Sequence, residues 1–102
     1  MVATATWSPQ EDAAVIALSG PLDRNSVPAL WQERAKWLAG EGDLTLHLAD
    51  VEKVDSAGVA LLIQAQKILK QQRRTLKLQH ANRQLRAIVE VSGVADLLNF
   101  ND

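Results

Sequence analysis

The chain has 102 residues, 47% of them hydrophobic and 23% charged, and a net charge of −1. This length and composition suit one soluble globular domain, spanning residues 1–102, with a core of its own. The near-neutral charge gives no electrostatic basis for nucleic-acid binding, and the absence of cysteine excludes disulfides and thiolate chemistry.

The sequence contains no apolar run near the roughly 18 residues that span a bilayer. Residues 1–7 lack the basic and apolar segments of a signal peptide. We therefore expect a cytoplasmic protein that does not insert into a membrane and that reaches one only through a partner.

The first half of the chain predicts two strands followed by a helix. Val2–Trp7 is rich in β-branched residues and predicts a short edge strand, and the apolar Ala13–Ser19 predicts a buried strand. A helix then begins with Asn25 or Ser26 as its cap. The apolar stripe of this helix consists of Val27, Leu30, Trp31, Ala35 and Leu38, with Trp37 beside it.

The second half predicts two more strands and two more helices. Asp43–Ala49 and Thr75–Gln79 alternate apolar and polar residues, as half-covered strands do. The helix between them ends near Gln72–Arg74, where basic side chains suit a helix C-terminus. Asn82 caps the last helix and Gly93 ends it. The expectation is an α/β domain with about four strands in a mostly parallel or mixed sheet and three to four helices. The residues expected to close its core at the end of the chain are Val94, Leu97, Leu98 and Phe100.

The turn Asp55-Ser56-Ala57-Gly58 precedes the second helix. Asp55 and Ser56 are both good cap residues, because their side-chain oxygens accept hydrogen bonds from the first N–H groups of a helix. Ala57 and Gly58 are small and leave the Ser56 hydroxyl accessible to a docking partner. A plain helix cap is the alternative interpretation of this serine.

The second helix has a core face and an opposite face. Two apolar residues on the opposite face, Val59 and Ile63, are expected to be exposed beside the Ser56 hydroxyl and to form a contact surface. The alternative is that another element of the same domain covers them. At about 100° per residue the core face consists of Leu61, Leu62, Ala65, Ile68 and Leu69, and the opposite face of Ser56, Val59, Ile63 and Lys70.

The sequence contains no recognisable catalytic arrangement. The only histidines, His47 and His80, form no metal-binding spacing, and Ser56 has no partner histidine in a known motif. The three carboxylates between residues 50 and 55 do not have the spacing of a calcium loop. We therefore expect no enzymatic activity, no cofactor and no metal.

Three segments resemble the STAS domain family, named for sulfate transporters and anti-sigma-factor antagonists. Residues 50–58, followed by Leu61-Leu62, resemble the signature loop of that family. Leu18–Asp23 is similar to its early Gly-x-Leu-Asp segment, and Leu85–Val94 to its last helix and the glycine after it. The resemblance covers nearly the whole chain and implies a STAS-like fold.

Two branches of the family are relevant. In the anti-sigma-factor antagonists the residue matching Ser56 is phosphorylated by a partner kinase, but these proteins usually carry a hydroxyl residue in place of Ala57 and an acidic residue in place of Pro21. The second branch is the cytoplasmic STAS subunit of the Mla phospholipid-transport ABC complex of Gram-negative bacteria. Here the likeness is closer, because Leu18–Asp23 is followed by Leu30-Trp31 and by a Val54-Asp55-Ser56-Ala57-Gly58 turn. In that branch a hydroxyl residue at the Ser56 position contacts the ATPase.

The resemblance implies a non-catalytic accessory subunit that binds the ATPase of an Mla-type transporter, supports its assembly or activity and contributes to outer-membrane lipid asymmetry. Such a protein is cytoplasmic and is held at the inner membrane by its partner. The alternative is an anti-sigma-factor antagonist controlled by phosphorylation of Ser56. The residues expected to bind the partner are Asp55, Ser56, Ala57, Gly58, Val59 and Ile63.

Overall fold

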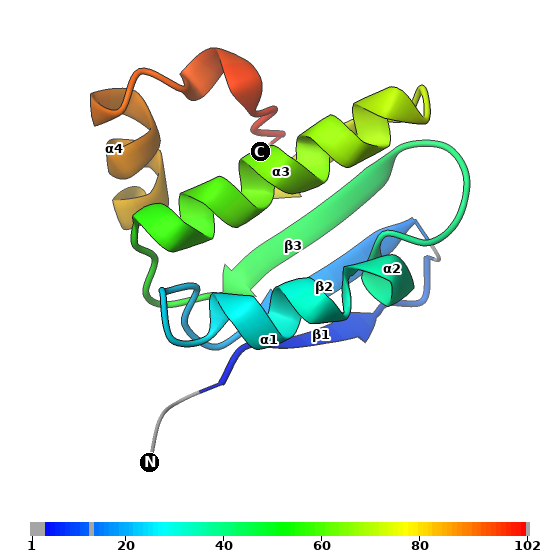
Figure 1. The fold of residues 1–102 in the computed structure, drawn as a ribbon, viewed down its shortest axis with the longest axis horizontal. Coiled ribbons are helices and arrows are strands. Elements are labelled where there is room, and N and C mark those ends of the chain that lie inside the picture. Colours follow the sequence, from blue (N-terminus) through cyan, green and yellow to red (C-terminus); the bar gives the residue numbers. More distant parts are fainter. Residues whose placement is uncertain (1–3, 13, 102) are drawn as a thin grey trace.

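The computed structural model describes residues 4–12 and 14–101. Its framework is a four-stranded sheet in the order β1-β2-β3-β4, with the helices on one face (Figure 1). β1 runs antiparallel to β2, whereas β2, β3 and β4 are parallel to one another. The expected α/β domain with a mostly parallel, mixed sheet is therefore confirmed. The strands are β1 (Thr6–Pro9), β2 (Val15–Ser19), β3 (Leu44–Asp50) and β4 (Leu76–Gln79).

Helices connect β2 to β3 and β3 to β4, and further helical elements follow β4. Because each crossover steps in the same direction along the sheet and crossovers are right-handed as a rule, successive helices are expected on the same face, as Figure 1 shows. The helical elements are α1 (Val27–Gln32), α2 (Arg34–Trp37), α3 (Ser56–Gln71), α4 (Arg83–Val91) and the 3₁₀ helix η1 (Ala95–Leu97).

The strands and helices differ from the predictions mainly at the N-terminal end. β1 begins at Thr6 and extends to Pro9, further than the expected edge strand, while Val2, Ala3 and Ala13 lie outside the described residues. Proline has no N–H to donate and so suits an edge strand.

The first predicted helix is two helices, because Glu33 leaves the helical conformation with φ −93° and ψ 7°. The break changes the direction of the side chains that follow. Trp37, expected beside the apolar stripe, is fully buried, and its indole N–H donates to the Leu30 carbonyl at 3.0 Å. Its ring lies edge-on to Trp31, with centroids 6.4 Å apart.

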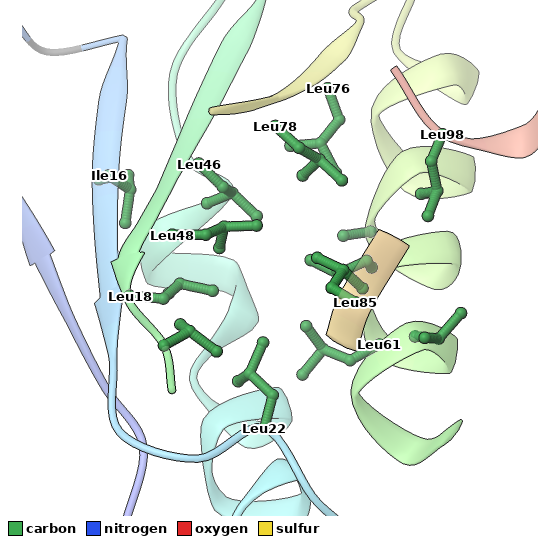
Figure 2. Packing of buried hydrophobic residues seen from close by; sticks show 14 of the residues in the cluster. Ile16, Leu18, Leu22, Leu46, Leu48, Leu61, Leu76, Leu78, Leu85 and Leu98 are labelled. Carbon is green, nitrogen blue, oxygen red and sulfur yellow. The ribbon is translucent and has the colours of Figure 1, made fainter. Parts of the chain in front are cut away.

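The core lies between the sheet and the helices (Figure 2). Alternate residues of the parallel strands point into it, including Leu46 and Leu48 of β3 and Leu78 of β4, and Leu61 of α3 meets them from the other side. Residues between these on the strands lie on the face without helices and are half-buried: Val15, Ala17, Thr45, His47, Lys77 and Gln79.

The chain after α4 covers the edge of β4. Gly93 ends α4 with a positive φ of 71°, as expected of a C-terminal glycine. Leu78 of β4 donates to the Asn99 carbonyl and accepts from the Asn101 N–H, both at 2.8 Å. Leu98 is buried as predicted, but Leu97 is 48% exposed and does not close the core. The 3₁₀ turn determines this difference, since it points adjacent leucines in different directions.

Arg74 is buried, although its sequence position indicated only a favourable helix end. Its guanidinium donates to the carbonyls of Leu38 at 2.6 Å and Gly42 at 2.7 Å, and to the Gln72 side chain at 3.0 Å. The side chain therefore ties the end of α3 to the end of α2 and to the loop before β3.

Candidate partner-binding site at the start of helix α3

The site is built on the loop of residues 20–26, which follows β2. The Ser26 hydroxyl donates to the Pro21 carbonyl at 2.6 Å and accepts from the Asp23 N–H at 3.0 Å. One carboxylate oxygen of Asp23 accepts from the N–H groups of Asn25 and Ser26, each at 3.0 Å. Ser26 precedes α1 but does not cap it with its side chain. Its hydroxyl instead holds the loop in one shape.

This loop lies beside the segment that leads into α3. Leu22 donates to the Lys53 carbonyl at 2.8 Å, and Asp55 donates to the Leu22 carbonyl at 3.1 Å. Leu22 and Val54 thus form an isolated parallel bridge, and both side chains are buried. Two segments about 30 residues apart in the sequence are held together at the start of the helix.

Asp55 is the N-cap of α3, and Ser56 is the first helical residue. One Asp55 carboxylate oxygen accepts from the N–H of Ala57 at 2.8 Å and of Gly58 at 3.4 Å, and the other from the N–H of Arg24 at 3.1 Å. Of the two cap residues considered from the sequence, Asp55 has the role. Its carboxylate also fixes the 20–26 loop against the helix.

Gly58 is buried where the two segments touch. A Cβ at this position would lie 2.4 Å from the Leu22 carbonyl oxygen and 2.8 Å from the Leu22 Cβ. A side chain at residue 58 therefore requires the loop to move. Gly58 is too deep to meet a partner, so its contribution is the close packing that positions Ser56.

Ser56 is exposed, and its hydroxyl has no hydrogen-bond partner in the part of the chain that the structure describes. Because Asp55 already supplies the cap, the hydroxyl remains able both to donate and to accept. The backbone beneath it is fixed by the Asp55 carboxylate and by Gly58. The site therefore presents one free hydroxyl at a rigid helix start.

The expected exposure of Val59 is wrong, since its side chain is only 5% exposed and belongs to the core. Ile63, one turn later on the same flank, is half-buried against that core. This flank of α3 faces the C-terminal part of the chain: a pocket beside Ile63 is lined on its other side by Asp96 and Leu97. α3 is packed on both flanks as well as on the sheet, so its buried arc is wider than a single stripe.

The exposed arc of α3 starts at Ser56 and continues through residues that sequence analysis did not select. Ala60 and Gln64 are the main additions. These residues follow Ser56 at intervals of three or four, which places them on the same side of the helix. That spacing is the signal in the sequence that could have identified them. We call it the α3 docking face, consisting of Ser56, Ala60, Gln64, Lys67 and Gln71.

A cavity of about 640 Å³ lies next to the site, between the 20–26 loop and the segment 50–53. Asp23, Asp50 and Glu52 line it together with Lys53, whose ammonium is 3.9 Å from Asp23. The Ser26 N–H, which donates to Asp23, lowers the pKa of that carboxyl below its ordinary value, although burial opposes the shift. Among the described residues no three potential ligands are grouped to hold a metal ion.

The two histidines lie together. Their rings are 4.6 Å apart, with His47 half-buried on β3 and His80 just after β4. Neither hydrogen-bonds to Ser56 in the described structure, so the serine has no base to activate it as a nucleophile.

The family model described as "Mlab, STAS domain" matches residues 6–99. The chain belongs to the STAS domain family. Its fold and its Asp55-Ser56-Ala57-Gly58 turn thus belong to a STAS domain, and the resemblance found in the sequence is confirmed.

Relatives of this STAS domain come from both branches. It is 32% identical to the intermembrane phospholipid transport system binding protein MlaB of Escherichia coli, over 81% of this chain and 84% of the relative. It is 29% identical to the anti-sigma-B factor antagonist of Bacillus subtilis, over 89% of this chain and 84% of the relative. Both MlaB and the antagonists are therefore similar in sequence to this protein.

The fold is also similar to solved STAS structures. A putative anti-sigma factor antagonist from Thermotoga maritima matches with a TM-score of 0.76 at 17% identity, over 95% of this chain and 85% of the other. At this identity the likeness concerns the fold alone. No helix in the described part of the chain has the length and apolar character needed to cross a membrane.

Proposed function

We propose that this STAS domain is a non-catalytic accessory subunit that binds the ATPase of an Mla-type phospholipid-transport ABC transporter. In this role it supports assembly or activity of the ATPase and so contributes to outer-membrane lipid asymmetry. The protein is then cytoplasmic and is held at the inner membrane by its partner. The similarity to the E. coli MlaB supports this proposal.

The observation that carries the proposal is the free Ser56 hydroxyl on a rigid helix start. A fixed, unpaired donor and acceptor forms a hydrogen bond across an interface with little loss of conformational freedom. Ala60, one turn further along the α3 docking face, is small and lets a partner surface approach closely. Of the residues first expected to bind the partner, Ser56 is exposed, Asp55 and Ala57 are half-buried beside it, and Gly58 supports the packing beneath.

The test is titration of the purified ATPase subunit of the same organism with the wild type, Ser56→Ala and Ser56→Arg. Because Asp55 is the cap, Ser56→Ala is expected to change the stability of the free domain by less than about 0.5 kcal/mol. Ser56→Ala loses the hydrogen bond to the ATPase and leaves a partner group unsatisfied, which together weaken the binding free energy by about 1–3 kcal/mol. This corresponds to a roughly tenfold to hundredfold weaker affinity.

Ser56→Arg is expected to bind more weakly still, since it adds bulk and places a positive charge at the positive end of a helix. Ser8→Arg is the matched control: Ser8 is exposed on β1, where it pairs with Ala17 on the sheet face that lacks helices. Equal affinity for the wild type and both Ser56 variants would remove Ser56 from the interface. Absence of ATPase binding by the wild type would contradict the proposed function itself.

The second candidate function is that of an anti-sigma-factor antagonist whose Ser56 is phosphorylated by a partner kinase. The similarity to the B. subtilis antagonist favours it, and Ser56 is accessible to a kinase. A phosphate there would interact favourably with the helix N-terminus but would lie next to the Asp55 carboxylate. Co-purification from cells separates the two functions, because one predicts capture of a transporter ATPase and the other capture of a kinase with a phosphorylated Ser56.

A further inference from the structure

A small pocket lies on the flank of α3, against η1. Its volume is about 210 Å³, and its lining residues are Ile63, Gln66, Lys67, Lys70, Asp96 and Leu97. We call it the α3–η1 pocket. Lys67 belongs both to this pocket and to the α3 docking face, so the two surfaces are continuous. A partner bound over Ser56 and extending along α3 reaches the pocket next.

The pocket has an apolar part that remains partly open to water. Leu97 is 48% exposed and is, with Val91, one of two large hydrophobic side chains exposed on the described part of the chain. Ile63 is half-buried on the opposite wall. Two adjacent apolar side chains that are partly exposed to water form an apolar surface. Burial of that surface by a partner is favourable in free energy.

The pocket also has a basic rim. Lys67 and Lys70 line it, and neither forms an ion pair within 4.0 Å with a carboxylate of the described residues. Asp96 is the one acidic residue in the lining, so the pocket carries a surplus of one positive charge. A protein with a net charge of −1 therefore presents a local cationic spot on its proposed docking side.

We propose that the α3–η1 pocket receives one apolar side chain of the partner ATPase, from a segment whose carboxylates face Lys67 and Lys70. This inference rests on the proposed function and extends it to a second contact on the same partner. Charge complementarity indicates the chemistry of the segment, since unpaired lysines at the rim of an interface attract carboxylates. The volume of the pocket limits the inserted group to one side chain, because this volume is smaller than that of ordinary small-molecule sites.

A protein segment fits this pocket better than an anionic membrane surface. Recognition of anionic lipid by charge uses clusters of about four to eight lysines and arginines. The pocket offers only two lysines, fewer than such a cluster. A partner segment instead matches both parts of the pocket, with its apolar side chain against Leu97 and its carboxylates against the rim.

The experiment measures binding of the purified ATPase subunit of the same organism to the full chain at low and moderate salt. Leu97→Asp and the double variant Lys67→Glu/Lys70→Glu are each expected to bind at least tenfold more weakly than the wild type. The wild type is expected to lose affinity as salt rises. The double variant is expected to reverse that dependence, because its glutamates repel the carboxylates and salt screens the repulsion.

Two controls carry changes of the same kind outside the pocket. Val91→Asp places the charge on a side chain that is 89% exposed and does not line the pocket. Lys36→Glu reverses a lysine of α2 whose side chain is 68% exposed. Both controls are expected to bind the ATPase as the wild type does. Every altered side chain is at least partly exposed, so all variants are expected to fold. Thermal melting of each variant beside the wild type checks this before binding is measured.

The possible failures are distinguishable. If the ATPase binds the wild type and Ser56→Arg weakens it while the pocket variants bind normally, the inference is overturned and the proposed function stands. If the ATPase does not bind the wild type, both are overturned. If the wild type instead sediments with phosphatidylglycerol vesicles through Lys67 and Lys70 and these residues do not affect ATPase binding, the pocket is a lipid contact and the inference is also overturned.

Discussion

Val59 and Ala60 are neighbours on α3 that the structure places in opposite environments. Val59 is 5% exposed and packs in the core, whereas Ala60 is exposed on the α3 docking face. The change to aspartate at each position therefore separates folding from binding. We expect Val59→Asp to destroy the fold and Ala60→Asp to leave it intact while abolishing binding of the ATPase.

The magnitudes follow from the burial. Val59→Asp removes about 1.5–3 kcal/mol of apolar burial and adds several kcal/mol for a carboxylate taken out of water. The sum approaches the whole stability of a small domain, about 5–15 kcal/mol. Ala60→Asp costs at most about 0.7 kcal/mol in helix propensity. At about 4–8 °C per kcal/mol, this lowers the melting temperature by less than about 6 °C.

The assay is a circular-dichroism melt of each variant, followed by titration of the ATPase with those that fold. Val59→Ala is the conservative companion, since loss of two methyl groups costs about 1.5 kcal/mol and should lower the midpoint by about 6–12 °C. A Val59→Asp protein that melts cooperatively near the wild-type temperature would show that residue 59 is not in the core. An unfolded Ala60→Asp protein would refute the position of the α3 docking face.

Three further changes test the structure around the site. Gly58→Ala should destabilise the domain by about 1–3 kcal/mol in urea denaturation, because the new Cβ meets the Leu22 carbonyl. Alanine usually favours a helix over glycine, so a more stable variant would contradict this close approach. Arg74→Met should cost on the order of 3 kcal/mol in the same assay, as it leaves buried carbonyls without donors, and an unchanged midpoint would show that water replaces the guanidinium. Asp23 has a lowered pKa in the fold, so its ionised form stabilises the protein above about pH 4 and that stabilisation is lost as the pH falls through the folded pKa. Asp23→Asn should therefore be less stable than the wild type at pH 6 and closer to it at pH 3, and a constant difference across that range would refute the assignment.

Local signals in the sequence were sufficient for the order and type of most elements. Alternation of leucines identified β3 and β4, and the Asn82 side chain caps α4 as expected, accepting from the Leu85 N–H at 2.8 Å. Asp55 was correctly recognised as a possible cap of α3. These features depend on residues a few positions apart, whose geometry the backbone itself determines.

The tertiary structure decided which side chains of these elements meet water. Val59 is buried because α3 is packed on its flank as well as on the sheet, and helical periodicity alone gives only the direction of the side chain. Trp37 is buried because the helix breaks at Glu33, and Arg74 because carbonyls 30 and more residues away converge on it. The contact of Gly58 with Leu22 and the α3–η1 pocket likewise join segments distant in the sequence. The hydroxyl at the helix start was therefore visible in the sequence, whereas the surface around it depended on how the chain packs.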